Sequence, residues 1–129
     1  MLLALTSFTT TAANQVVTSN ADSGAGTLRQ AITDVGSGET ITFNLSTGNE
    51  TIIIASELLI NKSLTIDGAN TAGSGVPVTV QVTTPATSPY RVFNIAVLGT
   101  VTINNLIMYG SLVNEFFPAP ICFIQLKKV

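Results

Sequence analysis

One dipeptide of this sequence places a carboxylate beside a flexible backbone position, Asp67-Gly68. A lone carboxylate can act as a general base or as one ligand of a calcium ion. The same pair is typical of a turn, because Asp bonds its own backbone and Gly adopts conformations closed to other residues. Catalysis needs a second charged group nearby, and the seven acids and five bases are spread along the chain without a cluster. The sequence therefore favours a turn.

Two other segments carry residue types that bind anions or sugars. Gly24-Ala25-Gly26 precedes a helical pattern, as a phosphate loop does, but it lacks the Lys-Ser/Thr of a P-loop and the third Gly of a dinucleotide site. We expect it to pack a strand against the start of the helix. Tyr90-Arg91 could stack on a sugar ring, since aromatic and guanidinium planes suit glycans. A strand edge that covers the core is the interpretation that we favour.

Two single residues complete the candidates. We expect Arg29 to pair with Asp67 or Asp34, or to bond loop carbonyls, rather than to bind a ligand. Cys122 is the single cysteine, and we expect a buried apolar residue or a stray thiol there, not a nucleophile.

Composition excludes most other chemistry. The chain has 129 residues, no His and one Cys, which excludes His-based metal sites, Ser-His and Cys-His catalysis and internal disulfides. Charged residues make up 9% and the net charge is −2, so the cations cannot neutralise a nucleic-acid backbone. No apolar run approaches the roughly 18 residues of a membrane span. We expect no catalytic residue, cofactor, metal, nucleic-acid partner or transmembrane segment.

The N-terminal residues 1–13 predict either a truncated signal peptide or a frayed strand. Residues 1–8 are largely apolar, and Thr11-Ala12-Ala13 would suit cleavage by a signal peptidase. A basic segment is missing, since the first Lys or Arg is Arg29. A signal would place the protein outside the cell or on its surface, which fits a body rich in Thr, Ser and Asn.

One helix is predicted, over residues 27–35. Thr27 followed by Gln30 forms a capping box, and Gly36 stands where a glycine often ends a helix. The apolar residues of this stretch recur at helical spacing, and they are Leu28, Ala31, Ile32 and Val35. So short a helix must dock this stripe on something apolar.

The rest of the chain predicts strands separated by Gly, Asn, Ser and Pro. The expected strands are 15–18, 40–45, 51–54, 58–60, 64–67, 76–83, 92–98 and 101–107. Four segments share the pattern apolar, Thr, apolar, Asn/Asp/Gln, and they are 41–44, 64–67, 78–81 and 101–104. Starts 23 residues apart suit the coils of a solenoid, whereas the middle spacing of 14 indicates either a tighter coil or a false match.

Stacked coils would have two consequences. The pairs Thr40/Thr42, Ser63/Thr65 and Thr100/Thr102 would form a hydroxyl ladder, similar to the surface of β-helical ice-binding proteins, although Thr is also common on exposed strand faces. The helix would cover one end of the stack as a cap. The other end would keep an unpaired edge, which predicts self-association.

Five segments follow one another in a fixed order along residues 15–110. They are Ser23-Gly24-Ala25-Gly26-Thr27-Leu28-Arg29-Gln30-Ala31-Ile32, Thr40-Ile41-Thr42-Phe43, Ile60-Asn61-Lys62-Ser63-Leu64-Thr65-Ile66-Asp67-Gly68, Arg91-Val92-Phe93-Asn94-Ile95 and Val101-Thr102-Ile103-Asn104-Asn105-Leu106. Together they resemble the N-terminal region of bacterial right-handed parallel β-helix surface proteins. The group includes adhesin-like, autotransporter-like and polymorphic outer-membrane-type passengers. The resemblance implies an all-β parallel β-helix of three to four coils over residues 14–110, capped by helix 27–35, on a secreted or surface protein.

The resemblance ends after Tyr109-Gly110. Residues 111–129 lack Thr and hold three of the six Phe residues, which indicates a frameshifted or prematurely ended frame, or a strand that folds over the open end. The expected function is a non-enzymatic, adhesin-like scaffold whose partner is a host or matrix glycan or protein. The alternatives are the N-terminal part of a carbohydrate-active β-helix enzyme and an ice-binding β-helix.

Overall fold

The computed structural model describes residues 13–83 and 91–109, and it describes the backbone of residues 123–127. These residues form mostly β-strands with one α-helix, which confirms an all-β class with a small helix. The elements are β1 (Gln15–Val17), α1 (Leu28–Asp34), β2 (Thr40–Phe43), β3 (Thr51–Ile54), β4 (Leu58–Ile60), β5 (Leu64–Asn70), the 3-10 turn η1 (Thr71–Gly73), β6 (Val76–Val82), β7 (Phe93–Ile95), β8 (Thr100–Asn104), β9 (Leu106–Tyr109) and β10 (Phe123–Lys127).

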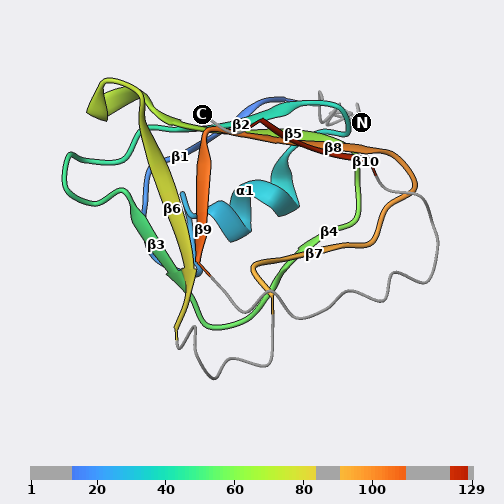
Figure 1. Cartoon of the computed structure of the whole chain (residues 1–129), viewed down its shortest axis with the longest axis horizontal. Helices are drawn as coiled ribbons and strands as arrows, with labels where there is room; N and C mark the ends of the chain where they lie inside the picture. Colours follow the sequence, from blue (N-terminus) through green and yellow to red (C-terminus); the bar gives the residue numbers. More distant parts are fainter. Residues whose placement is uncertain (1–12, 84–90, 110–122, 128–129) are drawn as a thin grey trace, which may run out of the picture.

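The strands pair in parallel in three columns. The first column runs β1, β2, β5, β8, β10; the second runs β3, β6, β9; the third holds β4 and β7. Figure 1 shows the three columns as three sides around α1. Only β5 and β6 also meet antiparallel among the described strands, at the corner where Ala69 lies opposite Pro77.

Alternation of apolar and polar residues builds the core between the three sides. In β2, Ile41 and Phe43 are buried while Thr40 and Thr42 are partly exposed, and β5 keeps the same alternation. Because neighbouring strands in a column lie about 4.8 Å apart, an inward side chain rests on the one below it. Ile41, Ile66 and Ile103 form one such inward column.

A buried asparagine completes the pairing at the corner after β2. The Asn70 side chain has no exposed surface, and Phe43 lies opposite it after a register shift between β2 and β5. Its Oδ1 accepts from the Leu45 N–H at 2.7 Å, and its Nδ2 donates to the Leu45 carbonyl at 2.9 Å. The amide therefore does for Leu45 what a neighbouring strand would have done.

The repeated pattern was only partly a guide to register. Residues 64–67 and 101–104 pair residue for residue, as predicted. The first copy is offset by two positions, since Ile41 lies opposite Ile66. The copy at 78–81 lies in β6 of the second column, so its match to the first column was false and the spacing of 14 needs no tighter coil.

The expected strand at 101–107 is two strands, β8 and β9. They are separated at Asn105, whose φ of 51° is left-handed, a conformation that Asn tolerates better than most residues. The chain turns there from the first column to the second. The expected strand at 92–98 is shorter and covers Phe93–Ile95 alone.

The helix matches its prediction in part. The Thr27 hydroxyl accepts from the Gln30 N–H at 3.3 Å, which confirms the N-cap, and the apolar stripe is buried. The Gln30 side chain donates to Asp34 at 2.9 Å, so the second half of the predicted capping box was wrong. The backbone of Val35 is already extended, and Gly36 does not have a left-handed φ angle. The prediction that Gly36 ends the helix as a left-handed C′ glycine was therefore wrong. Instead the Val35 N–H closes the last turn on the Ala31 carbonyl.

Several predictions fall on residues outside the described part of the chain. These are residues 1–12 of the signal-like segment, Tyr90, Cys122 and most of the tail at 111–129. Of that tail only the backbone of β10 is described, and it pairs parallel with β8. Among the residues that were placed, no helix is long and apolar enough to cross a membrane.

Substituting Asn70 tests the corner. We expect Asn70→Ala to lower the free energy of unfolding by about 2 to 4 kcal/mol, because it strands two buried backbone groups of Leu45. The exposed Asn49→Ala is the control and should change it by less than about 0.5 kcal/mol. Urea unfolding followed by circular dichroism measures both values, and equal values for the two variants would contradict the role of Asn70.

Candidate functional site

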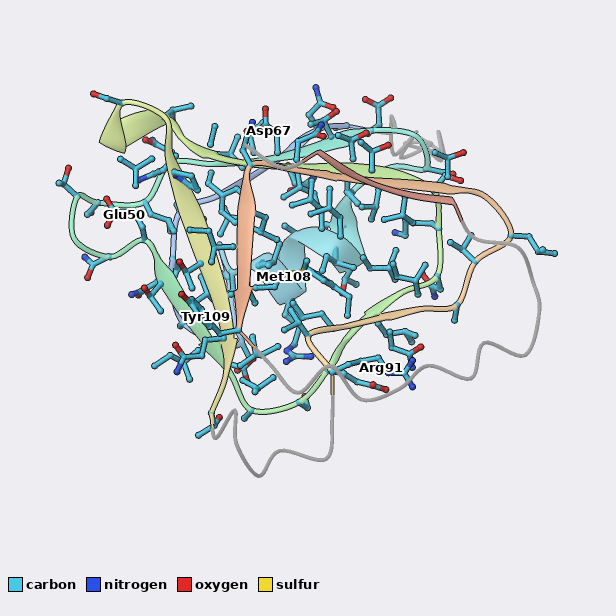
Figure 2. The ribbon with its side chains drawn as sticks, in the orientation of Figure 1. Glu50, Asp67, Arg91, Met108 and Tyr109 are labelled. Atoms are coloured by element: carbon cyan, nitrogen blue, oxygen red, sulfur yellow. The ribbon has the colours of Figure 1, made fainter. Side chains whose placement is uncertain are left out.

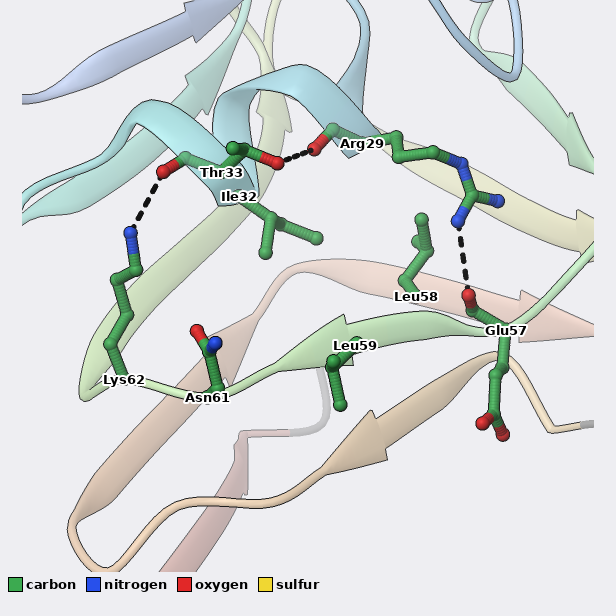
Figure 3. A pocket seen from close by; sticks show the side chains of 8 residues that line it. All are labelled: Arg29, Ile32, Thr33, Glu57, Leu58, Leu59, Asn61 and Lys62. Atoms are coloured by element: carbon green, nitrogen blue, oxygen red, sulfur yellow. Dashed lines mark hydrogen bonds between the residues drawn. The ribbon is translucent and has the colours of Figure 1, made fainter.

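A groove of about 360 Å³ lies between α1 and β4 and is the candidate site of the described residues. Its apolar floor comes from both elements, and its polar residues stand at the rim. It is lined by Arg29, Ile32, Thr33, Glu57, Leu58, Leu59, Asn61 and Lys62 (Figure 3). The groove lies where α1, which also contacts β1, packs beside β4.

Arg29 holds the start of α1 to the chain that leads into β4. Its Nη2 forms an ion pair with Asp22 Oδ1 at 2.7 Å and donates to the Ser56 carbonyl at 2.9 Å. Its Nη1 donates to the Glu57 carbonyl at 3.0 Å, and its Nε to the Asp22 carbonyl at 3.3 Å. Bonding of loop carbonyls was predicted and is confirmed. The expected carboxylate partners, Asp67 and Asp34, were wrong.

Lys62 holds the other end of the helix. Its Nζ donates to the Thr33 and Val35 carbonyls, both at 2.9 Å. These carbonyls belong to the last turn, where the helix dipole concentrates negative potential and favours a cation. No sequence pattern indicates this role of Lys62, because the residue lies 27 and 29 positions after the carbonyls that it caps.

The side chain of Glu57 points away from the groove. Figure 3 shows its carboxylate on the side of β4 opposite the helix. There Oε1 accepts from Asn94 Nδ2 at 2.8 Å, and Oε2 lies 3.7 Å from Arg91 Nε. The Arg91 side chain is 47% exposed, so its position over the outer side of β4 and β7 is not that of a core cover.

The arrangement leaves little for chemistry in the groove. Both of its cations are bonded to backbone carbonyls, and its one carboxylate points elsewhere. Asn61 directs a neutral amide toward the helix over a buried floor. Across residues 13–83 and 91–109, no three His, Cys, Asp or Glu side chains gather as metal ligands would.

Asp67 and Gly68 lie inside β5, not in a turn between strands, so the predicted turn was wrong. Asp67 Oδ1 accepts from the Ala69 N–H at 3.2 Å and from Asn105 Nδ2 at 3.0 Å, near the point where β9 begins (Figure 2). Gly68 has no room for a Cβ, which would collide with the Asn105 carbonyl. This stretch is an irregularity of β5, where its register against β2 shifts.

The glycine segment before α1 also packs. Gly24 and Gly26 have left-handed φ angles of 102° and 77°, and the Gly26 carbonyl accepts from the Thr18 and Ser19 N–H groups. The Thr27 hydroxyl donates to the Gly24 carbonyl at 2.7 Å. The segment thus joins the chain after β1 to the first turn of the helix.

Threonine side chains do form a row across the first column, but the residues that line up differ from those expected. Thr40 lies opposite Thr65, and Thr65 lies opposite Thr102, on the outer side of the first column. Thr42 lies opposite Val16 of β1 instead of Thr65. Ser63 accepts from the Thr100 N–H at 3.2 Å. The ladder therefore has three threonines in one row.

Two arginines allow a matched test of the helix clamp. We expect Arg29→Met to lower the free energy of unfolding by about 1 to 3 kcal/mol, because four hydrogen bonds are lost. Arg91→Met should change it by less than about 0.5 kcal/mol, since that ion pair is long and exposed. Both values come from urea unfolding, and a loss at Arg91 as large as that at Arg29 would contradict the clamp.

The strand columns and the residues on their outer sides are therefore the observations from which a function can be inferred. No family model, curated protein or solved structure matches the chain.

Proposed function

We propose that this chain is the capped end of a right-handed parallel β-helix that serves as a non-enzymatic, adhesin-like scaffold on a secreted or surface-exposed bacterial protein. The observation that carries the proposal is the three columns of parallel strands with α1 across one end. A stack of this kind is rigid along its axis and presents loops and flat strand faces to the surroundings.

The order of the strands supports a solenoid. The chain visits the columns in the same order each time, as β2, β3, β4, then β5, β6, β7, then β8 and β9. Thr40 meets Thr65 after 25 positions, Thr51 meets Thr79 after 28, and Leu64 meets Val101 after 37. Right-handed winding follows the general preference of parallel connections.

The outer side of the second column supports a binding role. Its six register positions are Thr51, Ile53, Thr79, Gln81, Ile107 and Tyr109. None of them is charged, and Ile53, Ile107 and Tyr109 are 52%, 42% and 57% exposed. A flat, uncharged face with an aromatic ring and hydroxyls suits a neutral glycan or a protein surface better than a charged polymer.

One observation favours a second candidate, an ice-binding surface. The row of Thr40, Thr65 and Thr102 repeats one hydroxyl at the spacing of the strands. The neighbouring row holds Ser63 beside Thr100, and the Ser63 hydroxyl is already bonded to that backbone. Thermal hysteresis in a freezing solution would support this second candidate over the adhesin.

The scaffold can be tested with glycans and matrix proteins. We expect the folded chain to bind at least one immobilised neutral glycan or matrix protein saturably, and the urea-unfolded chain to bind none. The same glycans should release no new reducing ends and no unsaturated uronates on incubation with the chain. Released products would establish an enzyme, and a lack of saturable binding would overturn the adhesive role.

The end away from α1 generates a second prediction. Leu106 and Met108 lie over buried Val78 and Val80 yet stay partly exposed, and β9 pairs only with β6 among the described strands. We expect concentration-dependent dimers by size exclusion with light scattering, because an apolar strand edge recruits another chain. Met108→Glu should weaken them. A strict monomer at high concentration would contradict this prediction.

A further inference from the structure

Three asparagines of this chain belong to Asn-x-Ser/Thr triplets. They are Asn44-Leu45-Ser46, Asn49-Glu50-Thr51 and Asn61-Lys62-Ser63. In such a triplet the side-chain amide nitrogen accepts a sugar, and the hydroxyl two residues later is required for recognition. A triplet is useful only where the fold leaves both groups accessible.

All three acceptor asparagines lie at exposed ends of strands. Asn44 directly follows β2, Asn49 precedes β3, and Asn61 directly follows β4, and all three are exposed. The contrast is Asn70, which is fully buried and lies outside any triplet. The connection from β2 to β3 projects from the body at the left of Figure 1, and Glu50 lies on it in Figure 2.

The three triplets differ in how free their hydroxyls are. Thr51 is exposed on the outer side of β3. Ser46 is exposed as well, although the amide oxygen of its partner Asn44 accepts from the Thr71 hydroxyl at 3.2 Å. Ser63 is half-buried, and its hydroxyl accepts from the Thr100 N–H at 3.2 Å. Access therefore decreases from the Asn49 triplet to the Asn44 triplet to the Asn61 triplet.

A defined turn presents the Asn49 triplet. The Asn49 N–H donates to the Ser46 carbonyl at 2.9 Å, and Gly48 has a left-handed φ of 89°. Glu50 Oε2 accepts from the Gly48 N–H at 2.9 Å, which directs the Glu50 side chain back onto the turn. The Asn49 amide is thus held on a short loop without being enclosed by it.

We propose that Asn49 is an attachment site for an N-linked glycan on the folded chain, with Asn44 a slower site and Asn61 the slowest. The bond from Asn49 Nδ2 to the anomeric carbon of the sugar forms as the bond from that carbon to a phosphate oxygen of the donor breaks. The amide proton passes to a base of the transferase, and the leaving group is a nucleoside or lipid diphosphate. The biological use of the site rests on the proposed secreted or surface location.

The composition supplies an independent reason for a glycan here. Charged residues make up only 9% of the chain, and the adjoining outer face of the second column has no charge. A hydrophilic, neutral polymer on the β2–β3 connection would keep such a surface solvated without adding charge.

The purified, folded full chain tests the site in two arms. One arm uses a soluble transferase that recognises Asn-x-Ser/Thr with a nucleotide-activated hexose, and the other uses a membrane transferase with a lipid-diphosphate-linked oligosaccharide. Intact mass and peptide mapping then report which asparagine is modified and how fast. The arm that reacts identifies the class of donor.

We expect Asn49 to react first, and Asn61 to react roughly tenfold more slowly, the cost of breaking one hydrogen bond at Ser63. Thr51→Val should abolish addition at Asn49 while the acceptor remains, and Thr51→Ser should restore it. In the urea-unfolded chain the three sites should react at similar rates.

Two results would overturn the proposal. The first is an unmodified Asn49 in the folded chain in both arms, when the unfolded chain is modified there. The second is Asn61 reacting before Asn49 in the folded chain. Because these reactions use purified protein, their failure leaves the proposed surface scaffold untouched, and failure of glycan or matrix binding leaves the acceptor result standing.

Discussion

Backbone hydrogen bonding from each strand to the strand one circuit later is the constraint on which this molecule depends. It is met along the straight sides by parallel pairing, but at a corner the neighbouring strand has turned away, and a buried N–H or C=O without a partner is costly. Asn70 solves this at Leu45 by offering an amide that both accepts and donates. Asp67 accepts from the Ala69 N–H in β5, and a bond to the Asn105 side chain ties it to the start of β9. Polar side chains therefore complete the backbone pairing where the strands end.

The need to satisfy backbone groups also explains why the groove beside α1 has few charged side chains free to react. A helix of seven residues cannot persist alone, so its two ends have to be held by the strands on which it packs. Arg29 bonds the chain entering β4, and Lys62, just after β4, bonds the last carbonyls of the helix. Charges committed to these contacts are not available to a ligand. Under the proposed scaffold role, a partner would therefore meet the outer faces, where side chains alternate away from the core.

The sequence predicted the kinds of element well and their alignment poorly. Thr27 and the apolar stripe determine the helix locally, and alternation determines the strands, so both could be found without a structure. Register could not, because a period of two leaves every side chain on its own face after a shift of two residues. The pattern aligned Ile41 with Leu64, whereas the structure pairs Ile41 with Ile66, and both registers keep Ile41 on the inner face. Backbone carbonyls carry no signature in the sequence. For Arg29, bonding to loop carbonyls was therefore predicted without naming the carbonyls, its carboxylate partner was wrong, and Lys62 was missed.

The unequal circuits of this chain show where new sequence can enter. Thr40 and Thr65 are 25 positions apart, whereas Leu64 and Val101, on the same side, are 37 apart, and both pairs stay in register. Lengthening a connection costs only the slowly growing entropy of closing a longer loop, about 0.6 kcal/mol for each doubling. Residues can therefore be inserted between strands of this fold while the paired positions and the inward side chains stay in place, which changes what the molecule presents without changing what holds it together.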